Sequence, residues 1–98
     1  MSLPVVLWAE AEDELQEGYD FFENQRLGLG DDFVAEVEGV FRRISVSPKL
    51  HAIVYKDVRK AVVPQFPYCV YYLAEPKEVA IVSVFHTSRD PSVWQGRR

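Results

Sequence analysis

The chain has 98 residues, of which 48% are hydrophobic and 27% are charged, so residues 1–98 are enough for a single domain with its own core and too few for two. No apolar run approaches the roughly 20 residues of a membrane-spanning helix, and the N-terminus has neither the basic start nor the apolar core of a signal peptide. We therefore expect a cytoplasmic protein without a membrane partner, whose one cysteine excludes an internal disulfide.

The net charge of −4 hides an uneven distribution of charge along the chain. The first 41 residues carry eleven acidic side chains and one basic side chain, Arg26, whereas the rest of the chain carries ten basic and four acidic ones. If these two segments occupy different faces, the protein is an electric dipole. Its basic side could then meet an anionic partner although the whole chain is acidic.

The first two predicted elements are a strand and a helix. Residues 3–8 form a short apolar run that favours a strand, and Pro4 restricts this strand to the start or the edge of a sheet. From residue 9 the period changes, because apolar side chains then recur at spacings of four, four and three. This pattern predicts a helix over residues 9–25. Its apolar face consists of Ala11, Leu15, Tyr19 and Phe22.

A second helix is expected to fold back on the first as a helical hairpin. Residues 26–30 form a short connection that contains two glycines. Asp31 or Asp32 is predicted to cap the second helix, because a carboxylate there accepts hydrogen bonds from unpaired backbone amides. The helix should end at Ser47, since the residue before a proline avoids the helical conformation. Its apolar stripe consists of Phe33, Val37, Val40, Phe41 and Ile44.

The remainder of the chain is rich in β-branched and aromatic residues, which favour strands. We predict a short edge strand at residues 53–55 and three further strands at residues 58–63, 68–73 and 79–85. Trp94 should attach the polar tail to the body. The expected fold is α+β: an N-terminal strand, a helical hairpin and a mainly antiparallel three-stranded meander forming one sheet, with the helices packed on one face.

No strong enzymatic or cofactor signature is present. The glycines between the helices do not follow a strand, as a phosphate-binding loop requires. His51, Cys69 and His86 are not spaced as metal ligands, so we expect neither a metal nor a cofactor. Cys69 lies within an aromatic strand and is interpreted as a small buried hydrophobic residue.

Basic residues near the strand ends are the remaining candidates for function. In a hairpin topology they could converge on one patch that binds phosphates or carboxylates. The alternative is a purely local role, a strand-end histidine at position 86 and a hydrogen bond from Arg89 to Asp90 or to a turn carbonyl. The candidate residues are Arg59, Lys60, His86 and Arg89.

Several motifs accompany this order of elements. They are Leu29-Gly-Asp-Asp-Phe33, Val58-Arg59-Lys60, Phe66-Pro67-Tyr68-Cys69-Val70-Tyr71-Tyr72 and Val84-Phe85-His86-Thr87-Ser88-Arg89-Asp90-Pro91. Over nearly its whole length the chain thus resembles the RelE/ParE superfamily of toxins from bacterial type II toxin–antitoxin systems. The resemblance implies one of two activities. RelE-like members cleave messenger RNA on the ribosome, whereas ParE-like members bind and poison DNA gyrase.

Matching the RelE pattern onto this chain places Lys60 at a catalytic lysine position. The other expected cationic and acid–base positions hold residues that cannot stabilise phosphate charge, which favours the ParE-like activity. These residues are Val62, Cys69, Thr87 and Val93. A RelE-like endoribonuclease acting on the ribosome and mRNA, with Arg59, Lys60, His86 and Arg89 as its catalytic residues, stays open as an alternative. A second alternative is a binding module of the same fold that has lost toxicity.

The resemblance also implies partners. A cognate antitoxin, ParD-like or similar, is expected to wrap a segment around the helical hairpin and the sheet, and gyrase is the expected target. Apolar residues that the core does not need are candidates for antitoxin binding: Phe21, Leu27 and Leu29. The residues expected to contact the target are Arg59, His86, Arg89 and Trp94.

Overall fold

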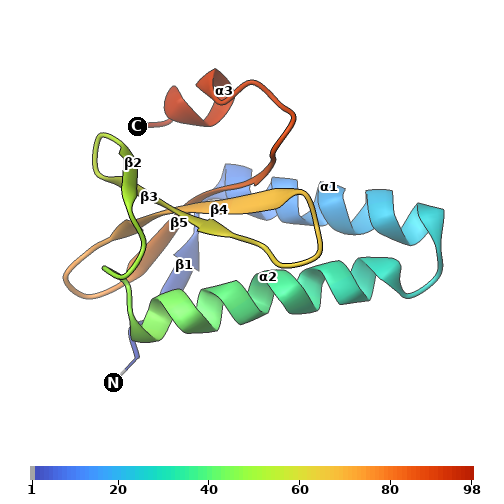
Figure 1. Cartoon of the computed structure of the whole chain (residues 1–98), viewed down its shortest axis with the longest axis horizontal. Coiled ribbons are helices and arrows are strands. Elements are labelled where there is room, and N and C mark those ends of the chain that lie inside the picture. Colours follow the sequence, from blue (N-terminus) through green and yellow to red (C-terminus); the bar gives the residue numbers. More distant parts are fainter. Residues whose placement is uncertain (1) are drawn as a thin grey trace.

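The computed structural model describes residues 2–98, which form one five-stranded sheet and three helices (Figure 1). In chain order the elements are β1 (Val5–Leu7), α1 (Ala9–Gln25), α2 (Leu29–Val46), β2 (Ile53–Tyr55), β3 (Val58–Val62), β4 (Tyr68–Ala74), β5 (Val79–His86) and α3 (Ser92–Gln95). This confirms the predicted α+β fold. The first strand is shorter than expected, and the short helix α3 was not predicted.

The sheet has the strand order β1-β5-β4-β3-β2. The meander from β2 to β5 is antiparallel, as predicted, whereas β1 lies parallel to β5 with Val5 opposite Val79 and Leu7 opposite Ile81. β1 is an edge strand, which agrees with the limit set by Pro4. Because β1 ends at Leu7, it covers only the first part of the β5 edge.

Each face of the sheet has its own apolar core. The first face is covered by α1 and α2, whose predicted stripes, apart from Tyr19, are buried or half-buried against it. Ala11 and Phe33 are fully buried there, and each large apolar side chain buried in this way contributes about 1.5–3 kcal/mol. The second face is covered by the tail, on the side of the sheet opposite α2 in Figure 1. There the ring of Trp94 stacks on Tyr71 with centroids 4.0 Å apart, so the prediction that Trp94 attaches the tail is confirmed.

The helical hairpin is tighter than its sequence indicated. A Cβ at Gly18 would lie 2.6 Å from Cε2 of Phe33, so the missing side chain lets the two helices approach. The predicted cap at Asp31 or Asp32 is wrong, because α2 already begins at Leu29. The carboxylate of Glu23 provides the cap instead. Its Oε1 accepts hydrogen bonds from the backbone N–H groups of Gly28 at 3.1 Å and of Gly30 at 2.9 Å.

None of the helices formed by residues 2–98 is both long and apolar enough to cross a membrane.

Candidate functional site

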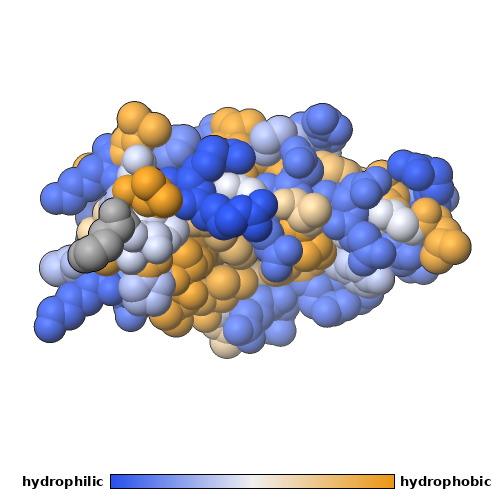
Figure 2. All heavy atoms as spheres, turned by 90° about the horizontal axis from the view of Figure 1, so that it is seen from below, coloured by the Kyte–Doolittle hydropathy of each residue, from blue (hydrophilic) through white to orange (hydrophobic). Residues whose placement is uncertain are grey.

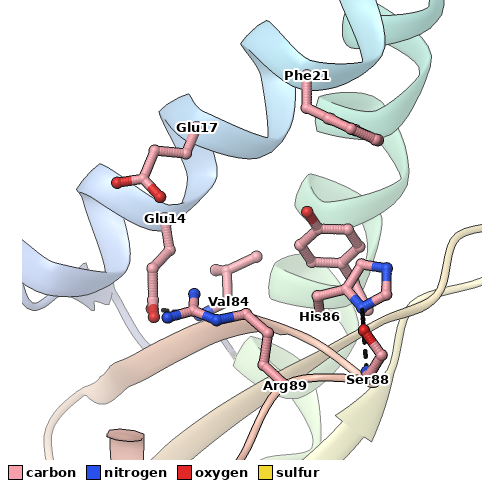
Figure 3. A pocket seen from close by; sticks show the side chains of 8 residues that line it. Glu14, Glu17, Phe21, Val84, His86, Ser88 and Arg89 are labelled. Atoms are coloured by element: carbon pink, nitrogen blue, oxygen red, sulfur yellow. Dashed lines mark hydrogen bonds between the residues drawn. The ribbon is translucent and has the colours of Figure 1, made fainter.

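An open pocket of about 410 Å³ lies where β5 ends (Figure 3). Its walls come from α1, from the starting residue of β4, from the last residues of β5 and from the loop that follows β5. The lining residues are Glu14, Glu17, Phe21, Tyr68, Val84, His86, Ser88 and Arg89. The pocket therefore combines aromatic surface with both acidic and basic side chains.

A buried carboxylate, Glu14, lies at the base of this pocket. It accepts hydrogen bonds from Ser83 Oγ at 2.8 Å and from the backbone N–H of Val84 at 3.2 Å. The guanidinium of Arg97 donates to both of its oxygens, at 3.0 and 2.9 Å, and also to the carbonyl of Val82 at 3.1 Å. These bonds to Glu14 raise the pKa of Arg97 above its ordinary value. We call this arrangement the Glu14–Arg97 pair.

The Glu14–Arg97 pair completes the edge of β5. Beyond Ile81 this edge has no neighbouring strand, since β1 pairs only as far as that residue. An N–H and a C=O group on a buried edge must find other partners. The N–H of Val84 donates to Glu14, which belongs to α1, and the carbonyl of Val82 accepts from Arg97, which belongs to the tail.

His86 and Tyr68 form one wall of the pocket, with their rings edge to face and their centroids 5.2 Å apart. Nδ1 of His86 accepts a hydrogen bond from the backbone N–H of Ser88 at 3.0 Å. A nitrogen that accepts from an amide carries no proton, so the proton of the neutral ring is on Nε2. The imidazole can therefore donate a hydrogen bond to a partner. Burial raises the pKa of the Tyr68 phenol, which is neutral near pH 7.

Arg89 contributes a positive charge to the same pocket. Its guanidinium carbon lies 4.7 Å from the centroid of the Phe85 ring, a cation–π arrangement that leaves the N–H groups able to bind a partner. The bond between Arg89 and Asp90, which was one form of the alternative local role, is not formed. The Asp90 carboxylate instead accepts from the backbone N–H of Ser92 at 3.0 Å, which lowers the pKa of Asp90.

The predicted convergence of Arg59 and Lys60 with His86 and Arg89 is wrong. Arg59 lies opposite Tyr72 of β4, whereas His86 lies opposite Tyr68, four residues or about 13 Å further along that strand. Arg59 also has a structural role, because its Nη1 donates to the carbonyls of Lys49 and His51. The side chain of Lys60 is exposed outside the pocket.

Trp94 is also placed differently from expectation. Its side chain is only 2% exposed, so it cannot be part of a contact surface while the tail is folded. Of the four residues expected to contact the target, the pocket thus brings together His86 and Arg89 alone.

The positions matched to the RelE pattern form no cationic cluster. Val62 lies directly opposite Cys69 in the sheet, and neither side chain carries a charge that could stabilise a phosphate. Cys69 is buried, as predicted, and burial raises the pKa of its thiol. Within residues 2–98, no three side chains of His, Cys, Asp or Glu are grouped as metal ligands.

The three apolar residues expected to bind an antitoxin differ in exposure. Phe21 is 55% exposed at the rim of the pocket, and Leu27 is 88% exposed in the connection between α1 and α2. Leu29 is partly buried against the core, so it is not surplus to the core.

Sequence reasoning missed Glu14, although a signal was present. Glu14 follows Ala11 by three residues and precedes Gly18 by four, which places a carboxylate on the buried face of the helix. A charge at such a position requires a buried partner. Nothing in the sequence pattern pointed to Arg97 as that partner.

Comparisons with known proteins cover most of the chain. A family model described as the ParE toxin of the type II toxin–antitoxin system parDE matches residues 5–91. Among solved structures, the chain is similar to one described as the chromosomal ParDE TA system from P. aeruginosa. The TM-score is 0.77 at 13% sequence identity, over 89% of this chain and 98% of that one, which shows a shared fold. No curated protein matches.

Proposed function

The chain belongs to the ParE toxin family of type II toxin–antitoxin systems, and on this basis we propose that it is a cytoplasmic toxin that inhibits DNA gyrase by binding it. A cognate ParD-like antitoxin neutralises it by covering part of its surface. Inhibition by binding needs no catalytic group and no cofactor. It needs a surface of defined shape and charge.

The observation that carries this proposal is that four of the five positions matched to the RelE catalytic set lack the expected cationic or acid–base side chain. Phosphoryl chemistry depends on groups that stabilise developing negative charge. Here Val62 and Cys69 occupy two of the matched positions, and the Arg59 guanidinium is engaged by loop carbonyls. His86 is also unsuited to act as a base, because its acceptor nitrogen is engaged by Ser88.

The pocket at the end of β5 supports a role in recognition. It presents Nε2–H of His86 and the guanidinium of Arg89 beside the exposed ring of Phe21. Arginine and aromatic side chains dominate the binding energy of many protein interfaces. We propose that an acidic side chain of gyrase binds Arg89 while an apolar group packs on Phe21.

A supercoiling assay with purified gyrase tests this function, with a translation assay run beside it on the same toxin preparation. We expect supercoiling to be inhibited at micromolar toxin while translation continues. Substituting Arg89→Ala should weaken inhibition about tenfold or more, because truncating a central interface residue often costs over 1.4 kcal/mol. Lys77→Ala, in the exposed turn between β4 and β5, is the matched control and should not change inhibition.

Three other results have definite meanings. Gyrase that is unaffected at micromolar toxin argues against the proposal. Cuts in the ribosomal A site, detected by primer extension on translated messages, indicate the RelE-like activity instead. Normal growth after induction without antitoxin, with neither activity in vitro, indicates a binding module without toxicity.

A further inference from the structure

Two exposed arginines near the end of α2, Arg42 and Arg43, carry positive charge that the protein itself does not use. Other arginines of the basic segment are engaged within the fold. Arg59 donates to loop carbonyls, and Arg97 and Arg98 pair with carboxylates. Within residues 2–98, neither Arg42 nor Arg43 takes part in an ion pair. Their guanidinium groups are therefore able to bind a partner.

The two guanidinium groups converge over Gly39. A Cβ built at Gly39 would lie 3.5 Å from Nη1 of Arg43 and 3.7 Å from Nη2 of Arg42. Side chains of a helix lean toward its N-terminus, so residues three and four positions further on cover the surface beside Gly39. Because Gly39 has no side chain, nothing of its own separates the two nitrogens. We call these two guanidinium groups over Gly39 the diarginine site.

A purely local role does not explain this arrangement. Arg42 follows Glu38 by four residues, a spacing at which acidic and basic side chains of a helix often pair, but this ion pair is not formed in residues 2–98. The guanidinium groups also extend back to Gly39 and not toward the last carbonyls of α2, where basic side chains interact with the helix dipole. Two like charges directed at one point repel each other. An anion between them would offset that repulsion.

The diarginine site lies on an open face of the molecule. Figure 2, which looks onto the α2 side from below, shows strongly hydrophilic side chains, in dark blue, gathered beside one another on this face. The site is close to the end of α2 that leads to β2 (Figure 1). No residue of α2 lines the pocket at the end of β5. A toxin that binds its target through that pocket can thus present the diarginine site to a different surface.

We infer that the diarginine site binds a phosphate group of a DNA backbone, so that the toxin contacts the DNA on gyrase as well as gyrase itself. One guanidinium already satisfies both oxygens of a carboxylate, whereas a phosphate can accept hydrogen bonds from two guanidinium groups. Because the net charge of the chain is −4, DNA is not attracted to the protein as a whole, and the contact must be local. The presence of DNA at the target rests on the proposed function, and the chemistry of the site does not.

An NMR titration of the full chain tests the site without gyrase. The probes are inorganic phosphate, a short DNA duplex and acetate, all at the same ionic strength. Phosphate and duplex should shift the resonances of the Gly39 backbone N–H and of both arginine Nε–H groups, and acetate should not. Substituting Arg42→Gln with Arg43→Gln should weaken binding of the duplex about tenfold. The slope of log affinity against log salt concentration should become about 1 smaller, because one phosphate contact is lost.

Two further variants separate the site from general charge effects. Arg26→Gln with Lys77→Gln also removes two exposed positive charges, both outside the site, and should leave binding unchanged. Gly39→Asp keeps both arginines and places a carboxylate beside them, so it should abolish phosphate binding. Its Cβ makes only ordinary contacts, at 3.5 and 3.7 Å, and the helix should tolerate it. Circular dichroism of each variant checks that the fold is retained.

A second measurement compares binding of the toxin to gyrase with and without DNA. The wild-type chain should bind gyrase about tenfold more tightly when DNA is present. The variant that lacks Arg42 and Arg43 should lose this gain and should bind gyrase alone as the wild-type chain does. A variant that keeps the full gain would overturn the inference.

The outcomes of the titration are equally definite. If neither phosphate nor duplex shifts the resonances of the site, or if acetate shifts them as strongly, the site does not recognise phosphate and the inference is overturned. If inorganic phosphate binds and the duplex does not, the DNA contact is overturned. If the duplex binds through the diarginine site but the toxin binds no gyrase, the proposed function fails while the site remains a DNA contact.

Discussion

Removing the guanidinium of the Glu14–Arg97 pair should destabilise the whole domain. The substitution Arg97→Met keeps an unbranched apolar stem and deletes three hydrogen bonds, two to the carboxylate and one to the carbonyl of Val82. The Glu14 and Arg97 side chains are 7% and 14% exposed, so the remaining carboxylate would be left largely buried without its counter-charge.

The size of the effect follows from this burial. Breaking one side of a buried ion pair typically costs about 3–5 kcal/mol, and a hydrogen bond to a charged group contributes about 1.5–3 kcal/mol. Ser83 and Val84 still donate to Glu14, and water can approach where Arg97 was, so we expect a loss of about 2–4 kcal/mol. For a domain of this length, that loss corresponds to a fall in melting temperature of about 10–25 °C.

Urea unfolding, followed by circular dichroism and by tryptophan fluorescence, measures this loss of unfolding free energy. Arg98→Met is the matched control, because Arg98 forms an exposed pair with Asp57 and should contribute little. Arg97→Lys should recover part of the stability, since an ammonium can still donate to the carboxylate. If Arg97→Met proves as stable as Arg98→Met, then the pair does not stabilise the fold and our account of the β5 edge is wrong.

Two further predictions concern the core. Gly18→Ala should lower the unfolding free energy, measured by urea titration, by about 1–2 kcal/mol. Although alanine favours helices, its Cβ would lie 2.6 Å from the buried ring of Phe33. A variant more stable than the wild-type chain would contradict this prediction. Burial raises the pKa values of Tyr68, Tyr71 and Tyr72 above the value near 10 that a tyrosine phenol has in the unfolded chain. The contribution of these residues to the unfolding free energy is therefore complete below about pH 10 and is lost as the pH rises further. The unfolding free energy, measured from pH 8 to 11, should fall with rising pH, and it should fall less steeply in Tyr72→Phe than in the wild-type chain. Equal slopes for the two proteins would refute this account.

The helices could be predicted from the sequence because their signal is local. Ala11 and Phe22, like Phe33 and Val37, recur at helical spacing and are buried as expected. The start of α2 could not be found in the same way. Its cap is a carboxylate from the preceding helix, Glu23, which reaches Gly28 and Gly30 only because the chain folds back.

The candidate site was only partly predictable, because register is a long-range property. Sequence placed His86 and Arg89 at the end of the last strand, and the structure brings both into one pocket. The sequence also suggested that Arg59 lies near His86 and Arg89, but the pairing of Arg59 with Tyr72 places it at the other end of the sheet. Strand patterns show which residues share a face and do not show which residues of two strands are opposite each other.

The parallel pairing of β1 with β5 has a consequence for synthesis on the ribosome. Val5 pairs with Val79, so the strand made first must wait for a partner that lies 74 positions later. At about 5–20 residues per second, that interval is about 4–15 s. The helical hairpin has local contacts and can form early during this time, whereas the apolar residues of β1 stay without their sheet. The nascent strand β1 therefore stays unpaired for longer than a strand whose sheet neighbour follows directly in the sequence.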